Sequence, residues 1–479
     1  MKLYDTLEKK ERLFKPLYDK TVKLYACGPT VYFYAHIGNM RTYISIDVLK
    51  RTLIHDKYKV KHVMNITDVG HNIGDGDVGE DKIKEEAKKE HRTAEEIIKF
   101  YTDSFMNDLK KLNIIKPDII SRASSNVEDM LKLIEILDEK GYLYRTNTGV
   151  YFDTSKVNEY GTLSGSSFEK LNKELKAGAR VERPEGLKNI TDFAVWRFSK
   201  PEEKEMVWDT KFGRGFPGWH IECSTMVMKF LGEQIDIHCG GADHISIHHS
   251  NEIAQSEAAT GKKFVKYWFH GAFLIVDGKK MSKSLRNVYT IEDLEKKKFM
   301  PLSFRYLVLT VHYRNILNFT LDVLKSADDS LKALYVFISK TSAVKDGTGI
   351  DEEFIRVINS KRDEFFEKAY DDINIPIAIT KMYEFINIVK KKALTKNEAD
   401  YVIKIMLDFD EILGLDFNMH LNSEIPKEAS KLIEEREIIR KARDFEKADR
   451  IREEIKKKYK IILEDTPEGT VWYKSSELY

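Results

Sequence analysis

The sequence predicts an α/β fold with a parallel sheet in its N-terminal half and helices in its C-terminal half. Segments rich in Val and Ile alternate with helical patterns up to about residue 70 and again near residue 240, as in proteins with a parallel sheet. Beyond Asn287, apolar residues recur at helical spacing, which predicts a helical bundle. With 479 residues, the chain exceeds what one hydrophobic core usually organises, so we expect two to four domains.

The first elements predict a strand, a loop, a helix and a second strand. KLYACGPTVY is an extended segment interrupted by Gly28 and Pro29, and a helical pattern runs from Thr42 to Arg51. The stretch KVKHVMNITDV, from Lys59, predicts the second strand, so the three elements form a βαβ unit. Thr67 and Asp68 would then lie near its carboxyl end, the edge at which open parallel sheets bind ligands.

The middle of the chain predicts an insertion followed by the rest of the sheet. The pattern is helical from Glu80 to Leu112, and residues 117–212 then mix short strands such as GVYFDT with a glycine-bearing loop. The α/β pattern resumes with the strand QIDIHCGGADH and a helix carrying HHSNEIAQSEAAT.

The C-terminal third is predicted to be helical almost to its end. Ile379, Met382, Tyr383, Ile386 and Val389 share one helical face. The segment EASKLIEEREIIRKARDFEKADRIREEI is also helical and leads to a short strand, KIILED.

The composition argues against a strongly basic protein and against a membrane protein. Lys and Arg total 79 against 78 Asp and Glu, so any surface for nucleic acid must be local. Residues 427–460 hold 13 basic and 9 acidic residues, a small local excess that a solvated helix also explains. The first residues, MKLYDTLEKKERLFKP, lack an apolar signal region, and no apolar run approaches the roughly 18 to 20 residues that cross a bilayer. We therefore expect a cytoplasmic protein with no membrane partner.

Three cysteines, Cys27, Cys223 and Cys239, are too few and too scattered for a disulfide framework. Metal binding, catalysis and simple burial remain open for each of them.

Two short motifs carry features of a phosphate site. The tetrapeptide His36-Ile37-Gly38-Asn39 lies between a strand and a helix, where small residues let a polyphosphate approach backbone N–H groups. On its own it could be an ordinary turn with a surface histidine. Lys280-Met281-Ser282-Lys283-Ser284 follows a turn at Asp277 and Gly278 and could close over a bound triphosphate, although a solvated basic loop is also common.

In this order, the two motifs resemble the HIGH and KMSKS signatures of class I aminoacyl-tRNA synthetases. A longer series then resembles the cysteinyl-tRNA synthetase family in particular, and its members are YACGPTVY, HIGNMRTY, NITDVG, GWHIECS, HHSNEIAQS and GKKMSKSLRN. The resemblance implies a Rossmann-like parallel-sheet catalytic domain with an inserted connective domain, a C-terminal helical bundle and a small mixed α/β anticodon-binding end.

From this organisation we expect six segments. They are the first half of the catalytic domain (1–116), the connective insertion (117–213), the second catalytic half (214–268), a stem-contact region with the KMSKS motif (269–325), the helical bundle (326–418) and the anticodon-binding domain (419–479).

The resemblance also implies one zinc ion per chain, held by Cys27, Cys223, His248 and Glu252. Two thiolates, an imidazole and a carboxylate form a reasonable tetrahedral zinc shell, and His248 and Glu252 are four residues apart on one helix face. A lone cysteine is more often a small buried hydrophobe, and His with Glu at this spacing is more often a surface pair. The joint pattern reverses that preference, and Cys239 is better explained by burial in a strand.

A zinc ion would explain how cysteine is distinguished from serine, alanine and valine. A hydrophobic slot separates such small groups by only ~1–3 kcal/mol, whereas zinc binds a thiolate directly. We therefore expect a zinc that admits the substrate's sulfur, and no hydrolytic editing domain.

The expected reaction joins L-cysteine to tRNA(Cys) at the expense of ATP, which binds with Mg²⁺. Cysteinyl-adenylate forms first, and the terminal adenosine of the tRNA then attacks it. The resemblance implies three sets of residues: catalytic His36, Asn39, Lys280 and Lys283; ATP-binding His36, Gly38, Asn39, Asp243 and Lys283; and substrate-binding Cys27, Gly28, Thr67, Trp219 and His248. Asp243 could equally cap a helix, and Trp219 and Thr67 could equally be packing residues.

Asn39 replaces the second histidine of the fuller HIGH motif, so a pair of imidazoles is ruled out. An amide can still donate a hydrogen bond.

At the C-terminal end, Arg440, Asp449, Arg452 and Asp465 match the positions at which the family reads the anticodon, and Arg and Asp can contact the edges of unstacked bases. Ion pairs on helix surfaces explain each of them nearly as well. From the resemblance we expect a monomer.

Two other functions remain open. A related ligase could activate cysteine and pass it to a small amine, and a noncatalytic relative could only bind RNA. The helical bundle and the LEDTPEGTVW tail argue against the first, while the intact HIGN, KMSKS and zinc positions argue against the second.

Overall fold

The structure is a computed structural model that describes residues 1–69, 82–166, 185–201, 203, 205–281, 287–421, 426–459, 461–466 and 469–474. The chain forms two compact units. The first comprises Met1–Lys297, Tyr313–Phe319 and Asp371–Ile373, and the second comprises Lys298–His312, Thr320–Tyr370 and Asn374–Tyr479. Among the described residues, no helix is long and apolar enough to cross a membrane.

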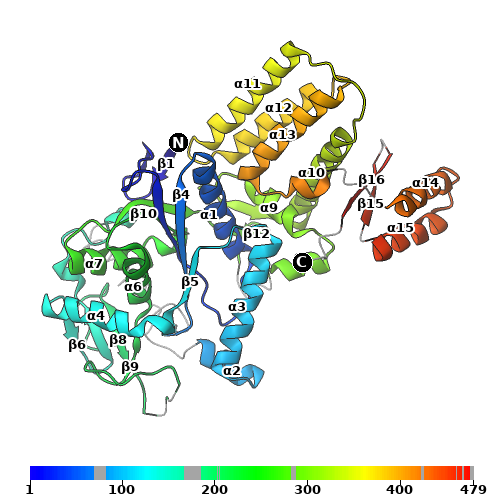
Figure 1. Cartoon of the computed structure of the whole chain (residues 1–479). Helices are drawn as coiled ribbons and strands as arrows, with labels where there is room; N and C mark the ends of the chain where they lie inside the picture. Colours follow the sequence, from blue (N-terminus) through cyan, green and yellow to red (C-terminus); the bar gives the residue numbers. More distant parts are fainter. Residues whose placement is uncertain are drawn as a thin grey trace. The chain divides into compact units, whose positions relative to one another are not determined.

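A five-stranded parallel sheet lies at the centre of the first unit, as the sequence predicts (Figure 1). Its strand order is β11–β10–β3–β4–β5, and the strands are Val265–Gly271, Ile235–Gly241, Thr21–Ala26, Lys59–Ile66 and Ile119–Arg122. The direction of strand progression reverses between β3 and β10. The carboxyl ends of these two strands therefore border the crevice in which open α/β sheets bind ligands.

Three helices cover the sheet near this crevice. Helix α1 (Ile37–His55) joins β3 to β4 and contains the predicted segment 42–51, while α6 (Trp219–Leu231) and α7 (His248–Thr260) flank β10. The β3–α1–β4 and β10–α7–β11 connections leave the crevice in opposite directions. Because such crossovers are right-handed, α1 and α7 lie on opposite faces (Figure 1).

The segment between β4 and β5 holds two helices where a single helical pattern was predicted. Helix α2 spans Lys82–Glu90 and α3 spans Ala94–Lys111. His91 has a positive φ of 53°, and Thr93 caps α3 by accepting from the Glu96 N–H, so the chain turns between them.

The predicted insertion begins with a strand of the main sheet, because β5 pairs in parallel with β4. After α4 (Val127–Glu139) comes a separate antiparallel sheet, in the order β6–β7–β8–β9, with strands Leu143–Arg145, Gly149–Phe152, Phe193–Phe198 and Gly215–Pro217. One hydrophobic core joins this sheet to α4 and α6, and Phe152, Trp196 and Ile134 are buried in it.

The remaining elements of the first unit are short. They are the hairpin β1–β2 (Lys2–Asp5 and Lys10–Leu13), the strands β12 (Leu274–Val276), β13 (Lys279–Lys280) and β14 (Leu317–Phe319), and helix α8 (Ile291–Lys296). Strands β12 and β13 form the hairpin that carries the start of the KMSKS motif.

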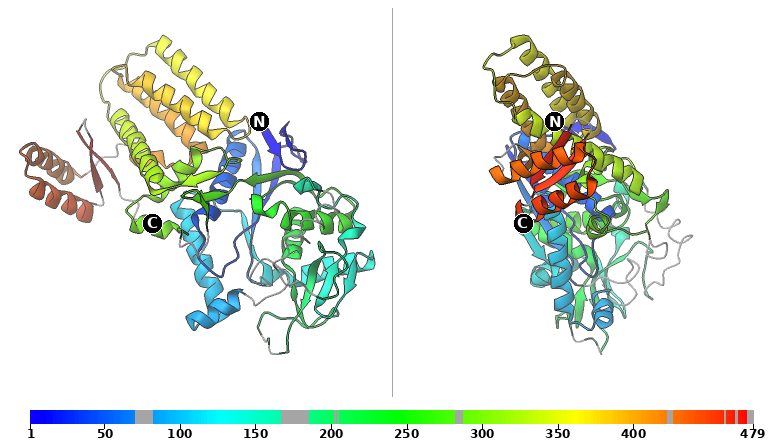
Figure 2. Two further views of the ribbon diagram at one scale, coloured as in Figure 1. Left: turned by 180° about the vertical axis from the view of Figure 1, so that it is seen from behind. Right: turned by 90° about the vertical axis from the view of Figure 1, so that its right-hand side faces the viewer.

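The second unit is mainly helical. It contains α9 (Pro301–Leu309), α10 (Leu321–Ser342), α11 (Glu352–Ala369), α12 (Ile375–Val389) and α13 (Lys396–Leu413). Helices α11 and α12 lie side by side (Figures 1 and 2). On α12, Ile379, Met382, Ile386 and Val389 are buried and Tyr383 is half-buried, as their spacing predicts.

The C-terminal end pairs two helices with a hairpin. Helices α14 (Lys427–Lys441) and α15 (Phe445–Tyr459) are followed by β15 (Ile461–Thr466) and β16 (Gly469–Lys474). Ala429, Ile433, Ile455 and Leu463 pack together in a core of their own.

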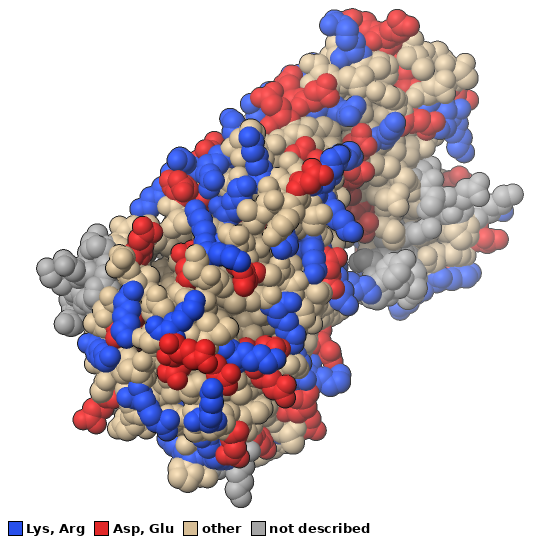
Figure 3. Space-filling model, turned by 60° about the vertical axis from the view of Figure 1, so that its left-hand side comes forward, with Lys and Arg blue, Asp and Glu red and all other residues tan. Residues whose placement is uncertain are grey.

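The surface carries mixed charge. On the face drawn in Figure 3, Lys and Arg are interspersed with Asp and Glu, in keeping with the near balance of the whole sequence.

Candidate active site and metal centre

Four side chains that could bind a metal ion converge where β3 ends. Cys27 follows β3, Cys223 lies on α6, and His248 and Glu252 lie one turn apart on α7. One ligand atom from each lies within 4.8 Å of the other three, and all four residues are buried. His248 Nε2 is 3.0 Å from Glu252 Oε1. The end of β3 comes about 200 residues before α6 and α7 in the sequence, and the fold brings the four predicted ligands of these three elements together.

The electrostatics of this cluster are those of a cation site. Burial opposes ionisation of Cys223, but its hydrogen bond with Cys27 and the charge of His248 outweigh burial and lower the pKa of Cys223 to about 6. Burial likewise opposes protonation of His248, but the charges of Glu252 and Cys223 raise its pKa to about 10. The lowered pKa of Cys223 and the raised pKa of His248 thus both follow from opposite charges that face each other inside the cluster.

Two further histidines border the cluster, and the sequence analysis missed both. His238 on β10 places Nε2 2.9 Å from Glu252 Oε2, and His249 on α7 places Nε2 3.3 Å from Cys27 Sγ. The adjacent pair His248-His249 was the sequence signal that could have pointed to the second of them. Cys239 is buried in β10 and belongs to neither metal-ligand group found among the described residues.

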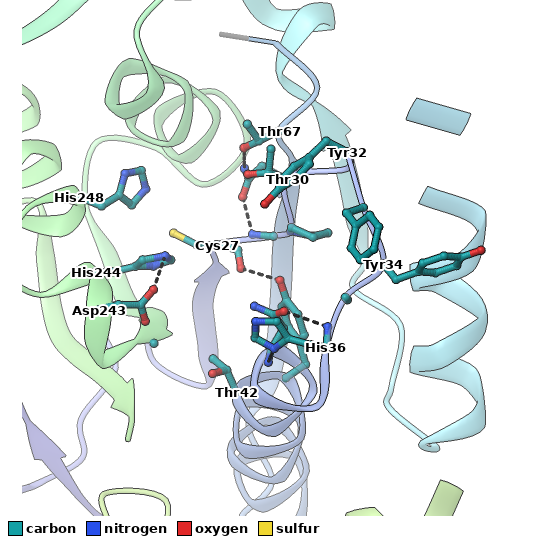
Figure 4. A pocket seen from close by; sticks show the side chains of 18 of the residues that line it. Cys27, Thr30, Tyr32, Tyr34, His36, Thr42, Thr67, Asp243, His244 and His248 are labelled. Atoms are coloured by element: carbon teal, nitrogen blue, oxygen red, sulfur yellow. Dashed lines mark hydrogen bonds and ion pairs between the residues drawn. The ribbon is translucent and has the colours of Figure 1, made fainter. Parts of the chain in front are cut away.

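A pocket of about 490 Å³ opens beside the cluster. Cys27, Cys223 and His248 line one part of it, and His36 and Asn39 line another. Figure 4 shows Cys27 and His248 on one side of the pocket and His36 at the start of α1 on another. Three of the four predicted metal ligands and the predicted nucleotide motif therefore face the same cavity.

The floor of the pocket requires a glycine after Cys27. A Cβ atom on Gly28 would lie 1.7 Å from the backbone oxygen of Asn65, so only glycine lets the ends of β3 and β4 approach this closely. The Gly28 N–H donates to Asn65 Oδ1 at 2.7 Å, and Asn65 Nδ2 donates to Thr67 Oγ1 at 3.0 Å. Thr67 in turn donates to Glu222 Oε2 at 3.2 Å. Glu222, a fully buried carboxyl that the sequence analysis did not single out, thus orients the hydroxyl of Thr67.

Trp219 and Asp243 also line the pocket. The Trp219 ring stacks on the His248 ring, with centroids 4.4 Å apart and planes at 21°. Asp243 lies in a short turn after β10, and its Oδ2 is 3.8 Å from His244 Nε2.

His36 and Asn39 form the N-terminal cap of α1. The Asn39 N–H donates to His36 Nδ1 at 3.2 Å, and the His36 N–H donates to Asn39 Oδ1 at 3.1 Å. Burial lowers the pKa of His36 and favours the neutral ring. Because Nδ1 is an acceptor, the ring proton lies on Nε2, which can donate to a ligand.

The HIGN and KMSKS segments lie close together at Gly38 and Met281. A Cβ atom on Gly38 would lie 2.5 Å from Met281 Cε, so a larger residue at position 38 would displace Met281. Lys280 is exposed on β13, and its carbonyl accepts from Asn287 Nδ2 at 3.2 Å. Lys283 lies outside the described residues.

Comparison with known proteins decides the family. A family model described as the catalytic domain of class I (C) tRNA synthetases matches residues 13–329. The chain is 41% identical over 475 residues to cysteine–tRNA ligase 1 of Burkholderia lata, covering 98% of this chain and 95% of that one. It is 40% identical over 500 residues to the cysteine–tRNA ligase of Treponema denticola, covering 99% of both. The chain belongs to the cysteine–tRNA ligase family.

The fold of this family member also matches a solved class I synthetase. The Mycobacterium tuberculosis methionyl-tRNA synthetase bound by methionyl-adenylate aligns with a TM-score of 0.60 over 84% of this chain and 94% of that one, at 15% identity. At that identity the match concerns the fold alone.

In this member of the cysteine–tRNA ligase family, the predicted anticodon residues meet at Asp465. Arg436 donates to both carboxylate oxygens of Asp465 at 2.8 and 2.7 Å, while Arg440 and Arg452 approach it at 3.2 and 2.7 Å. Arg452 also pairs with Asp449 at 3.2 Å. Arg436, which the sequence analysis missed, has a side chain only 1% exposed and is the buried partner that anchors the group.

Proposed function

We propose that the chain activates L-cysteine with ATP to cysteinyl-adenylate and transfers the cysteinyl group to the 3′ end of tRNA(Cys). One observation carries this proposal. Three residues of the metal-ligand cluster, Cys27, Cys223 and His248, line the same pocket as the His36–Asn39 cap of α1, so a cysteine side chain and a nucleoside triphosphate can occupy one cavity. Membership of the family supplies the reaction class.

The residues of the cluster fit a zinc ion. Two sulfurs, one imidazole nitrogen and one carboxylate oxygen are the donors that zinc prefers, and they are buried within 4.8 Å of one another. Bound zinc would supply a Lewis acid for the thiolate of the substrate, which a hydroxyl or methyl group cannot replace well. Cys27, Cys223, His248 and Glu252 would hold it.

The rest of the amino acid is held by protein groups. The Trp219 ring, stacked on His248, encloses the small side chain and excludes water from it. The Thr67 hydroxyl donates a hydrogen bond to Glu222 and accepts one from Asn65. One lone pair of its oxygen is therefore left to accept a hydrogen bond from the ammonium group of the substrate. Gly28, which lines the pocket, keeps the ends of β3 and β4 close together there.

The nucleotide lies over the start of α1 in this proposal. The first-turn N–H groups of the helix and the Nε2–H of His36 stabilise the negative charge that develops on the α-phosphate as the cysteine carboxylate attacks. Lys280 and Lys283 neutralise the leaving pyrophosphate, and Mg²⁺ accompanies ATP. Asn39 holds His36 in place, while Asp243 accepts a hydrogen bond from the ribose.

The C-terminal end would bind the anticodon. Arg440, Asp449 and Arg452 offer directional donors and acceptors to unstacked bases, with Arg436 and Asp465 fixing their positions.

Two linked assays test the proposal. Cysteine-dependent ATP–pyrophosphate exchange should occur, with serine giving none, and labelled cysteine should then transfer to tRNA(Cys). Exchange without transfer to RNA would instead favour a ligase for small amines. Absence of exchange in the folded, zinc-loaded chain would leave only an RNA-binding role.

A further inference from the structure

We propose that the chain has a second metal position, formed by Cys27, His238, His249 and Glu252, beside the one formed by Cys27, Cys223, His248 and Glu252. The four ligand atoms of this second group also lie within 4.8 Å of one another, and all four residues are buried. The two positions share Cys27 and Glu252 and differ in their other two ligands.

The carboxylate of Glu252 is oriented to serve both positions. Its Oε1 is 3.0 Å from His248 Nε2, and its Oε2 is 2.9 Å from His238 Nε2. His249 Nε2, the other imidazole nitrogen of the second group, is 3.9 Å from Oε1, so both oxygens of the carboxylate face ligands of that group. Cys27 Sγ likewise lies beside the second group, 3.3 Å from His249 Nε2.

His249 has the hydrogen bonding of a metal-binding imidazole. Its Nδ1 lies 2.7 Å from His270 Nε2, and His270 Nδ1 lies 2.8 Å from Thr6 Oγ1. In metal sites, the ring nitrogen that does not bind the ion usually makes such a hydrogen bond, which fixes the orientation and tautomer of the ring. Here it leaves the Nε2 of His249 directed at Cys27.

The protein around the two histidines holds them in place. The His238 ring stacks on the Trp268 ring, with centroids 4.8 Å apart and planes at 21°. A Cβ atom on Gly240 would lie 2.6 Å from the His249 ring, so the glycine at the end of β10 makes room for it. Repositioning either imidazole would therefore disturb a packed core.

The second position differs from the first in its access to substrate. Cys27, Cys223 and His248 line the pocket, whereas of the second group only Cys27 does. An ion held by His238 and His249 would be separated from the cavity that a cysteine sulfur enters, and it would compete with the first position for Cys27 and Glu252. The chain could therefore contain a bound metal ion and still fail to activate cysteine.

The ligand sets predict different spectra. The first position has two thiolates and the second has one. Co²⁺, which takes the same tetrahedral ligands as zinc, gives a sulfur-to-cobalt charge-transfer band whose intensity follows the number of bound thiolates.

The test is Co²⁺ titration of the metal-free, full-length chain, starting from Cys223→Ser, which disables the first position. We expect this variant to bind one equivalent of Co²⁺, with about half the charge-transfer intensity of the wild type. Adding His249→Gln should weaken its Co²⁺ binding by more than about tenfold, whereas adding His248→Gln should leave it unchanged.

The reverse pattern would overturn the proposal. If His248→Gln abolishes binding in the Cys223→Ser background and His249→Gln does not, the ion stays at the first position with three ligands. Loss of all Co²⁺ binding in folded Cys223→Ser would also overturn it.

Thermal melting of each metal-free variant checks that it folds. If Cys223→Ser fails to fold, His248→Gln disables the first position instead, and adding His249→Gln to it should again weaken Co²⁺ binding by more than about tenfold. Co²⁺ binding can be measured whether or not the chain activates cysteine, so failure of this inference and failure of the proposed function are distinguishable.

Discussion

The backbone N–H of Asn39 donates to the imidazole Nδ1 of His36 at 3.2 Å, and the backbone N–H of His36 donates to the side-chain Oδ1 of Asn39 at 3.1 Å, across the first turn of α1. Asn39 therefore caps the start of α1 at the position where the fuller HIGH motif has a second histidine. Its Oδ1 satisfies the N–H of His36, and its own N–H fixes which nitrogen of His36 carries the proton.

Replacing Asn39 should separate these effects from phosphate chemistry. Asn39→Ala removes the acceptor for the His36 N–H and should lower the free energy of unfolding by about 0.5–2 kcal/mol, together with a lower rate of cysteine activation. Asn39→Asp keeps an acceptor but adds a negative charge near the triphosphate, so it should retain stability and lose activity. Denaturant unfolding and ATP–pyrophosphate exchange measure the two effects, and unchanged stability in Asn39→Ala would contradict the capping role.

Glu222 should act on cysteine binding through Thr67. Glu222→Leu removes the acceptor of the Thr67 hydroxyl and should raise the KM for cysteine about tenfold or more, because the hydroxyl is left without its buried partner. Glu222→Gln still offers an oxygen and should stay close to the wild type. Steady-state exchange kinetics at varied cysteine and varied ATP test this, and an equal rise in the KM for ATP would argue for general disruption instead.

The sequence predicted the elements around the site well because local signals, such as glycines, mark where they end. HHSNEIAQSEAAT is confirmed as α7, which ends before Gly261, a glycine with φ of 70° that closes the helix. The parallel sheet is likewise confirmed, and most residues of β3, β4 and β10 are buried in it.

What the sequence could not predict depends on packing between distant segments. The helical pattern predicted over residues 428–455 is broken at Arg443, which has a φ of 63°, and Asp444, which accepts from the Lys447 N–H at 3.1 Å, caps the helix that follows. His238 and His249 join the metal cluster only because β10 pairs beside β3 and directs His238 towards α7. Strands buried on both faces show no alternation, so the inward residues cannot be chosen from the pattern.

Arg436 should be needed for tRNA binding but not for cysteine activation. Arg436→Leu removes the bidentate partner of Asp465, whose pKa the Arg436 hydrogen bonds lower to about 2. We expect the free energy of unfolding of the C-terminal end to fall by a few kcal/mol. Breaking a fully buried ion pair costs roughly 3–5 kcal/mol, and the loss should be smaller here because Asp465 keeps its ion pairs with Arg440 and Arg452.

The KM for tRNA in aminoacylation should then rise, with exchange unchanged. Arg450→Ala is the matched control, because the Arg450 side chain is 72% exposed and its ion pair with Glu446 is long, at 3.8 Å. Equal effects of the two substitutions would contradict a special role for Arg436.

His62 should make the stability of the first unit depend on pH. It is buried on β4, and burial, aided by the charge of Lys50, lowers its pKa to about 3. The folded state therefore binds fewer protons than the unfolded state between about pH 3 and 6.5, so the stabilisation is present above pH 6.5 and is lost as the pH falls.

One proton corresponds to about 1.4 kcal/mol per pH unit. His62→Leu should remove that contribution, so its thermal midpoint should fall less than that of the wild type between pH 7 and pH 5, within the window set by the lowered pKa. Parallel curves for the two proteins would contradict it.

The central claim is that Cys27, Cys223, His248 and Glu252 hold a zinc ion that selects cysteine by binding its sulfur. X-ray absorption at the zinc edge of the wild-type chain, with and without L-cysteine, tests this most directly because it counts sulfur neighbours. We predict two sulfurs without substrate and three with L-cysteine, with L-serine leaving two. A sulfur count that does not change when L-cysteine is bound would contradict the claim.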